Sequence, residues 1–191
     1  MARRSRQHAA ATRARILASA GQLVRTRGAH AVTLDDVARA IGMTRGAVYG
    51  HFRSRAELLG ALLADAEADI AARLDCAAPD TPARLDRVLA ALLEGDGLAR
   101  HASLLSALLQ HKCTDACELC PLRARICCQA ERLRERLAAW LPDPLHAHLL
   151  MAHLWGLLGA QSLQLAPDRL SHWAAPLARL YADGAPMRDT P

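Results

Sequence analysis

One short stretch of the chain, GMTRGAVYGHFRSRAELL at residues 42–59, combines side chains that can bind nucleic acid. A long arginine side chain can reach base edges in the major groove, while hydroxyl and backbone N–H groups bind phosphate. Arg45 is the candidate base-reading residue. The other candidate DNA-contacting residues are Thr33, Thr44, Gly46, Tyr49, His51 and Arg53. The sequence therefore predicts a DNA-contacting surface in and just ahead of this stretch.

A second set of reactive side chains lies in KCTDACELCPLRARICCQ, residues 112–129, which holds five of the six cysteines. In one continuous helix all five thiols would fall within an arc of about 100°. Pro121 allows another arrangement, in which a helix begins near Cys120 and its N-terminus stabilises nearby thiolates. Three interpretations stay open: small buried residues on a packed helix, a redox or electrophile switch, or a site for a thiophilic metal or metalloid. The candidate metal ligands are Cys113, Cys117 and Cys120.

The composition favours a helical protein. Apolar residues make up 52% of the 191 residues and aromatic residues 3%, with many Ala, Leu and Arg and few Val and Ile. The longest apolar stretch, residues 149–160, has 12 residues interrupted by His153, which is short of the roughly 20 that span a bilayer. The charged start has no continuous apolar run behind it, which argues against a signal peptide. We expect a cytoplasmic protein with no membrane partner.

Charge is distributed unevenly along the chain. Residues 1–55 hold eleven arginines and two acidic residues, hence a formal charge of +9, whereas residues 56–191 hold 13 basic and 17 acidic residues, hence −4. A basic block on a small module attracts polyanions, of which nucleic acid is the commonest. Charge alone also fits a solubilising surface, so the spacing of residues has to decide.

Helix start and stop signals predict an all-α fold without strand-like alternation. The first four helices are expected at about residues 10–27, 34–41, 45–52 and 54–74. Thr33 and Thr44 should cap the second and third, whatever else they do, and Ser54 and Glu57 form a capping box for the fourth. A turn at Gly42 joins the second and third helices, which makes a helix-turn-helix. Its core is expected to be Val37, Ala47, Val48 and Phe52.

Further helices are expected after the turn-rich residues 76–82. Their ranges are 83–94, 98–112, 116–140, 145–164 and 168–182. The 145–164 helix is apolar around most of its circumference, so both of its faces should be covered.

The segment VTLDDVARAIGMTRGAVYGHFRSRAELL, residues 32–59, resembles the DNA-binding segment of the TetR family of bacterial transcriptional regulators, and the resemblance extends over residues 10–63. It implies a homodimer that binds a palindromic operator in double-stranded DNA, usually as a repressor that a small-molecule effector releases. It also implies a helix-turn-helix DNA-binding domain at 1–55 and an effector-binding and dimerisation domain at 56–191. Gly50 departs from the family pattern, where bulkier residues are common, and should loosen the third helix. The matching motif residues are Thr44, Gly46, Ala47, Tyr49, His51 and Phe52.

LLQHKCTD at residues 108–115 and the following PLRAR resemble a subgroup, the AcrR-like regulators of multidrug efflux. This implies control of an efflux or detoxification operon and an apolar pocket for hydrophobic compounds. The candidate pocket residues are Leu92, Leu104, Leu108, Cys113, Leu122, Ile126 and Trp155. The family also implies a dimer interface on the last two long helices, although each residue can equally be core. The candidates there are Leu149, Met151, Trp155, Leu158 and Trp173.

Two other function classes were weighed. The chain has no GxGxxG, P-loop, GxSxG or HExxH motif, so we expect no enzyme and no required cofactor, with a thiophilic metal ion only as an alternative effector. A non-specific architectural DNA binder would barely discriminate between sequences. The helix-turn-helix interpretation instead predicts a specificity ratio of at least about 10³ over random DNA.

Overall fold

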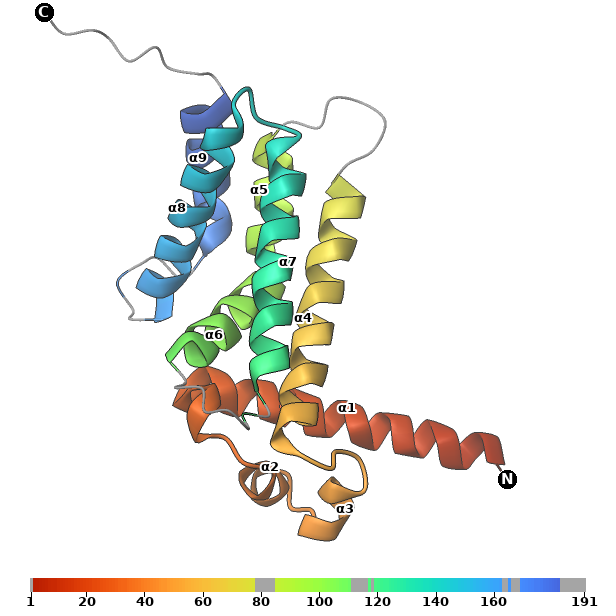
Figure 1. Cartoon of the computed structure of the whole chain (residues 1–191). Helices are drawn as coiled ribbons and strands as arrows, with labels where there is room; N and C mark the ends of the chain where they lie inside the picture. Colours follow the sequence, from red (N-terminus) through yellow and green to blue (C-terminus); the bar gives the residue numbers. More distant parts are fainter. Residues whose placement is uncertain are drawn as a thin grey trace, which may run out of the picture. The chain divides into compact units, whose positions relative to one another are not determined.

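The structure is a computed structural model that describes residues 2–77, 85–110, 117, 119–162, 165 and 169–182. Within these ranges the chain is helical and has no β-strand, so the all-α prediction is confirmed (Figure 1). None of the described helices is both long enough and apolar enough to cross a bilayer. The elements are α1 (Ala2–Arg27), η1 (Ala29–Ala31), α2 (Leu34–Ala40), α3 (Arg45–Tyr49), α4 (Arg55–Ala77), α5 (Leu85–Glu94), α6 (Gly97–Gln110), α7 (Cys120–Ala138), α8 (Pro144–Ser162), η2 (Leu170–Trp173) and α9 (Ala174–Ala182).

Several helix ends differ from the predicted ones. Helix α4 extends to Ala77 rather than to residue 74, and α7 covers Cys120–Ala138 rather than 116–140. Helix α1 begins at Ala2 rather than near residue 10, because an Ala- and Arg-rich run without a breaker favours helix. Helix α3 ends at Tyr49, three residues early, and Gly50 is its C-cap. The range 168–182 was predicted as one helix, whereas a 3₁₀ turn precedes α9.

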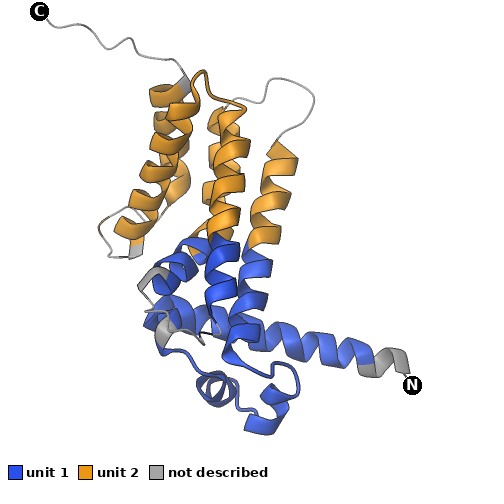
Figure 2. Cartoon of the chain, viewed as in Figure 1, with its two compact units in different colours: residues 1–66, 100–126 blue, residues 67–99, 127–191 orange. Residues whose placement is uncertain are grey.

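The chain forms two compact units (Figure 2). Unit 1 comprises residues 1–66 and 100–126, and unit 2 comprises residues 67–99 and 127–191. The predicted functional boundary between residues 55 and 56 lies at the start of α4 and does not coincide with this division. Helices α4, α6 and α7 each contribute residues to both units. The functional division therefore remains a prediction.

The core of unit 1 joins the N-terminal helices to α6 and the start of α7. Val48 and Phe52, from α3 and the turn after it, are fully buried in this core. They lie in one cluster with Leu104 and Leu108 of α6 and with Ile126 of α7. Burial of these side chains holds α3 in the core of unit 1.

In unit 2, the corner between α5 and α6 explains why the predicted helices break between residues 94 and 98. Asp69 of α4 accepts a hydrogen bond from the Gly97 backbone N–H (3.1 Å) and pairs with Arg73 (3.0 Å). Arg73 also donates to the Ala91 carbonyl (3.1 Å). A Cβ at Gly95 would collide with the Arg73 guanidinium, and one at Gly97 with the Asp69 carboxylate. Only glycine lets this backbone approach the ion pair so closely.

Candidate nucleic-acid interface

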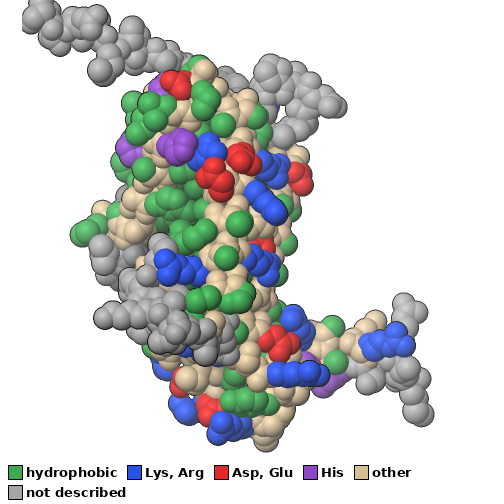
Figure 3. All heavy atoms as spheres, viewed as in Figure 1, with side chains coloured by type: hydrophobic (Ala, Val, Ile, Leu, Met, Phe, Trp, Pro, Cys, Tyr) green, Lys and Arg blue, Asp and Glu red, His purple; other side chains and the backbone are tan. Residues whose placement is uncertain are grey.

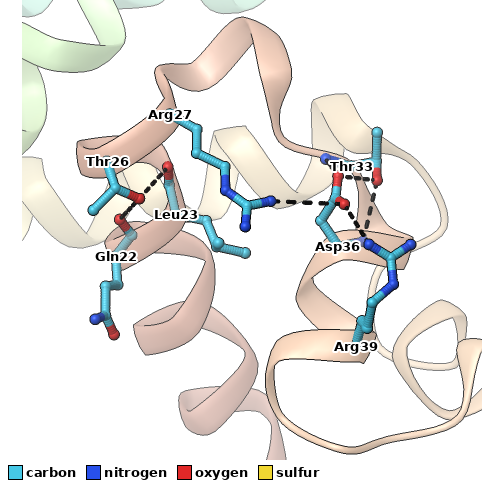
Figure 4. Close-up of polar contacts among 7 residues, drawn as sticks. All are labelled: Gln22, Leu23, Thr26, Arg27, Thr33, Asp36 and Arg39. Carbon is cyan, nitrogen blue, oxygen red and sulfur yellow. Dashed lines mark hydrogen bonds and ion pairs between the residues drawn. The ribbon is translucent and has the colours of Figure 1, made fainter.

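Helix α2 begins at a reciprocal capping box. The Thr33 hydroxyl accepts a hydrogen bond from the Asp36 backbone N–H (3.1 Å) and donates one to the Asp36 carboxylate (2.6 Å), as Figure 4 shows. The Thr33 backbone N–H donates to the same carboxylate (3.1 Å). The predicted cap is thus confirmed. The Thr33 hydroxyl already donates its hydrogen bond to Asp36. A phosphate that accepts from this hydroxyl would therefore have to replace Asp36.

The Asp36 carboxylate is also the centre of a small charge cluster. Arg39 lies 3.1 Å from it and Arg27 lies 4.0 Å from it (Figure 4). The side-chain and backbone hydrogen bonds from Thr33, followed by the charge of Arg39, hold the pKa of Asp36 below its ordinary value of 3.8. The carboxylate therefore stays ionised when the helix is formed.

A glycine turn connects α2 to α3. Gly42 has a φ of +65°, in the left-handed region that favours glycine. The Met43 N–H donates to the Ala38 carbonyl (2.9 Å) and the Gly42 N–H to the Arg39 carbonyl (3.4 Å), which is the pattern of a Schellman motif. Two residues further, the Thr44 hydroxyl accepts from the Ala47 N–H (3.3 Å) and caps α3, as predicted. Local hydrogen bonds therefore set both ends of the turn.

Helix α3 buries one side and leaves its predicted DNA-contacting residues exposed. Val48 is fully buried, whereas Arg45 and Tyr49 point outward one helical turn apart. A Cβ at Gly46 would meet no atom within 4 Å, so the backbone there is open to an approaching partner. The helix thus presents a long cation, a phenol and bare backbone on one surface.

Arg45 is held by two neighbours. Its Nε lies 3.0 Å from Asp35 Oδ1, and its Nη2 donates to the Tyr49 hydroxyl (3.4 Å). The guanidinium carbon lies 5.3 Å from the Tyr49 ring centroid, within cation–π range. The hydrogen bond to Tyr49 and then the charge of Asp35 raise the pKa of Arg45 above its ordinary value. The side chain is 70% exposed, so it is oriented yet accessible.

The remaining candidates lie around the start of α4. His51 is half-buried and Arg53 is exposed. The predicted capping box is only half formed as expected: Ser54 accepts from the Glu57 N–H (3.1 Å), but the Glu57 carboxylate accepts from Arg53 N–H (2.7 Å) rather than from Ser54. Figure 3 shows cationic side chains over the helix-turn-helix, at the bottom of the view, with acidic side chains among them.

Two residues of this surface were not predicted from the sequence. Asp35 is the partner of Arg45, although its position in the first turn of α2 indicated only a helix-dipole role. Arg13 of α1 lies with its guanidinium carbon 4.6 Å above the Phe52 ring. Nothing in the local sequence signals either contact, because each joins separate elements: α2 with α3 in the first, and α1 with the turn after α3 in the second.

The structure separates the predicted effector-pocket residues. Four of them are buried together in the core of unit 1, namely Leu104, Leu108, Leu122 and Ile126. Leu92 and Trp155 belong to unit 2, where Leu92 is buried and Trp155 is half-buried. Cys113 lies outside the described residues. The pocket remains a prediction, and the four leucine and isoleucine residues serve as core in this structure.

The cysteines do not share one continuous helix. Cys117 is not helical, and α7 begins at Cys120 with Pro121 in its first turn, which is the second of the predicted arrangements. The Cys120 N–H donates to the Cys117 carbonyl (3.3 Å), so these two belong to one turn. Cys127 and Cys128 are exposed. Among the residues that the structure describes, no three His, Cys, Asp or Glu side chains gather as a metal site.

Comparisons with known proteins agree with this geometry. Residues 16–62 match the family model described as "Bacterial regulatory proteins, tetR family". The chain is 46% identical over 63 residues to the HTH-type transcriptional regulator TtgR of Pseudomonas putida, covering 33% of this chain and 30% of TtgR. It is 33% identical over 117 residues to AcrR of Shigella flexneri, covering 59% of this chain and 54% of AcrR.

The similarity extends over nearly the whole chain in three dimensions. The structure of the multidrug binding protein EbrR complexed with malachite green has a TM-score of 0.61 and 27% identity, covering 88% of this chain and 97% of that one. The helix-turn-helix and the helical remainder define a class of DNA-binding regulators. Residues 16–62 of this chain belong to the tetR family of bacterial regulatory proteins. The matches cover 30% of TtgR and 54% of AcrR.

Proposed function

We propose that this chain is a transcriptional repressor that binds a palindromic operator in double-stranded DNA as a homodimer and is released by a hydrophobic small molecule. The observation that carries the DNA-binding part is the presentation of Arg45 at the start of α3. It is 70% exposed and held at 3.0 Å from Asp35, on a helix whose opposite side is buried. An N-terminal arginine of a recognition helix is placed to read base edges in the major groove.

Exposed apolar side chains on α8 and α9 support the homodimer. Leu145 and Leu149 of α8 are 61% and 49% exposed, and Leu180 of α9 is 54% exposed. Figure 3 shows hydrophobic and histidine side chains gathered over these helices. On the same side of α8, Gly156 and Gly159 leave space in which a Cβ would meet nothing within 4 Å. Small residues beside exposed leucines suit a closely packed helix from a second copy.

The predicted interface residues differ in exposure and so divide into two groups. Leu149 and Trp173 are exposed and remain interface candidates. Met151 and Leu158 are each only 7% exposed, so the alternative weighed for them, core within one chain, describes them better. Trp155 is half-buried. Position around α8, which sequence alone left open, separates the two groups.

Similarity to drug-binding regulators supports a hydrophobic effector and control of an efflux or detoxification operon. EbrR, the 27% identical neighbour, is a multidrug binding protein, and the AcrR match continues beyond the helix-turn-helix. A route for release exists inside unit 1. An effector that displaces Leu104 or Leu122 disturbs the cluster that also holds Val48 of α3, and a closely packed core transmits such a strain.

A thiophilic metal ion is the second candidate effector. The turn that joins Cys117 and Cys120 favours it, since it places two cysteines in one short loop. Release from DNA by Zn²⁺ or arsenite, lost in Cys117→Ser/Cys120→Ser and kept in the exposed-cysteine control Cys127→Ser/Cys128→Ser, would establish it. Release that survives the first variant would eliminate this pair as the ligands.

Fluorescence anisotropy tests the proposed function directly. Palindromes from the upstream region of the gene and a random duplex of equal length are titrated with protein, and malachite green or another lipophilic cation is then added. We expect at least about 10³-fold tighter binding to the operator and its release by a lipophilic compound. Equal binding to both duplexes would instead identify a non-specific DNA binder.

A further inference from the structure

We propose that Asp35 is a positioning residue that sets sequence specificity by holding the Arg45 guanidinium through its Nε edge. The inference rests on the proposed DNA-binding function and adds to it a residue that makes no base contact itself. Asp35 belongs to α2, and Arg45 is the first residue of α3, so the pair joins the two helices of the helix-turn-helix.

The contact leaves the base-reading edge of Arg45 available. A guanidinium carries five N–H groups in a fixed fork. Asp35 Oδ1 lies 3.0 Å from Nε as an ion pair without a well-aligned hydrogen bond, and one Nη2–H is donated to the Tyr49 hydroxyl. Three N–H groups remain, on the two terminal nitrogens. Two parallel bonds from these nitrogens to O6 and N7 of guanine form the commonest arginine base contact.

The backbone around the pair is set by local hydrogen bonds. Asp35 lies in the first turn of α2, between the two partners of the Thr33–Asp36 capping box. Arg45 follows the Thr44 cap directly. Between them runs the turn at Gly42, with its φ of +65°. The distance between the Asp35 and Arg45 backbones is therefore defined before DNA arrives, which is the condition for preorganised recognition.

Stability does not account for this ion pair. Exposed ion pairs contribute little to folding, and Arg45 is 70% exposed. Asp35 Oδ1 is shielded from solvent and makes no well-aligned hydrogen bond, so the nearby charge of Arg45 is what compensates it. Residues 1–55 contain only two acids, of which Asp36 is used by the cap. The other lies beside the proposed base reader, where its charge opposes phosphate.

The negative charge of Asp35 and its positioning of Arg45 affect specific and non-specific DNA binding differently. Its charge repels the backbone of every duplex, whereas its hold on Arg45 matters only where a base accepts the guanidinium. Removing the charge should therefore strengthen binding to random DNA and weaken or leave unchanged binding to the operator. The ratio of the two affinities is the quantity that reports positioning.

The test is a double-mutant cycle on the full chain, with Asp35→Asn, Arg45→Ala and the double variant. Affinities for the operator palindrome and for a random duplex are measured by anisotropy at two salt concentrations. We expect Asp35→Asn to lower the specificity ratio about tenfold, within the range that one bidentate base contact supplies. It should also relax the same operator position as Arg45→Ala. In the Arg45→Ala background, Asp35→Asn should leave the ratio unchanged.

Two further variants separate positioning from charge. Asp35→Glu keeps the charge and the helix-dipole interaction but moves the carboxylate, so we expect a reduced ratio there as well. Asp65→Asn removes one exposed acid of unit 1 that pairs with Arg100, and should leave the ratio at the wild-type value. Circular dichroism checks that each variant keeps its helices.

The outcomes that would overturn the inference are distinct from a failure of the proposed function. If Asp35→Asn changes both affinities by the same factor, or if its effect persists without Arg45, Asp35 acts only through its charge. A wild-type ratio near one would instead show that the proposed function is wrong, and no variant would then be informative about Arg45.

Discussion

Helices α3 and α8 show two opposite ways in which a helix is specified. Helix α3 has five residues, one of them buried, and its ends are set by the Thr44 cap and by Gly50. Helix α8 has 19 residues and is apolar over most of its surface. Its exposed positions include Leu145 and Leu149 as well as polar residues. Local hydrogen bonds decide what α3 exposes, whereas packing decides what α8 exposes.

This contrast between α3 and α8 shows for which residues exposure can be inferred from the neighbouring sequence. In α3, caps and a glycine turn fix the orientation of Arg45 and Tyr49, so their exposure follows from neighbouring residues. In α8, leucines occur on both faces, and only the fold separates Leu150, fully buried, from Leu149 beside it. Four predictions test this contrast between the two helices.

The largest effect is expected on the free energy of unfolding, at Phe52, whose burial in the core anchors the short helix α3. Phe52→Ala empties a fully buried site and should reduce the free energy of unfolding by about 3–5 kcal/mol, measured by urea denaturation. Tyr49→Ala removes an aromatic ring that is 37% exposed and is the matched control, with a small effect on stability. Equal effects of the two changes would mean that α3 is not anchored through Phe52.

A charge on the exposed face of α8 should separate the proposed dimer. Leu149→Arg would place an unpaired cation in the interface and raise the dimer dissociation constant at least about 100-fold, measured by sedimentation equilibrium. Ala72→Arg adds the same side chain to an exposed position of α4 and should leave the dimer intact. A dimer that survives Leu149→Arg would contradict the assignment of this face.

Replacing two glycines of the helix-turn-helix by alanine should change the stability of the protein in opposite directions. Gly42→Ala forces a Cβ onto a residue with a φ of +65° and should lower stability by about 1–2 kcal/mol. Gly46→Ala places its Cβ in open space and should raise stability by up to about 1 kcal/mol. If Gly46 contacts DNA, as predicted, the stabilised variant should nevertheless bind the operator less tightly. Thermal unfolding and anisotropy on the same samples report both quantities.

The smallest effect concerns the cap that orients α2. The pKa of Asp36 lies below its ordinary value of 3.8 in the folded protein. The stabilisation that Asp36 supplies is therefore present above that value and is lost as pH falls through the folded pKa. We expect wild type to be more stable than Asp36→Asn at neutral pH and the two to converge as the pH falls below 3.8. A difference independent of pH would show that the carboxylate charge plays no part in the cap.

Much of the N-terminal region could be predicted because its signals are local. The caps at Thr33 and Thr44 and the stop at Gly42 each depend on residues within about one helical turn. The exposed position of Arg45 follows from them. The contact of Arg13 with Phe52 could not be predicted, since it joins α1 to the turn after α3 and no short-range pattern encodes how these elements pack.

By itself, the sequence determined the helical class, the helix-turn-helix with its caps, and the candidate base reader Arg45, because backbone hydrogen bonding and helix propensity act over a few residues. The tertiary structure alone decided that Asp35 faces Arg45, that Leu104 and Leu122 share one core cluster with Val48 of α3, and that Leu149 is exposed while Met151 is not. These outcomes depend on which apolar faces meet, and an apolar residue carries no local mark of the neighbour that will cover it.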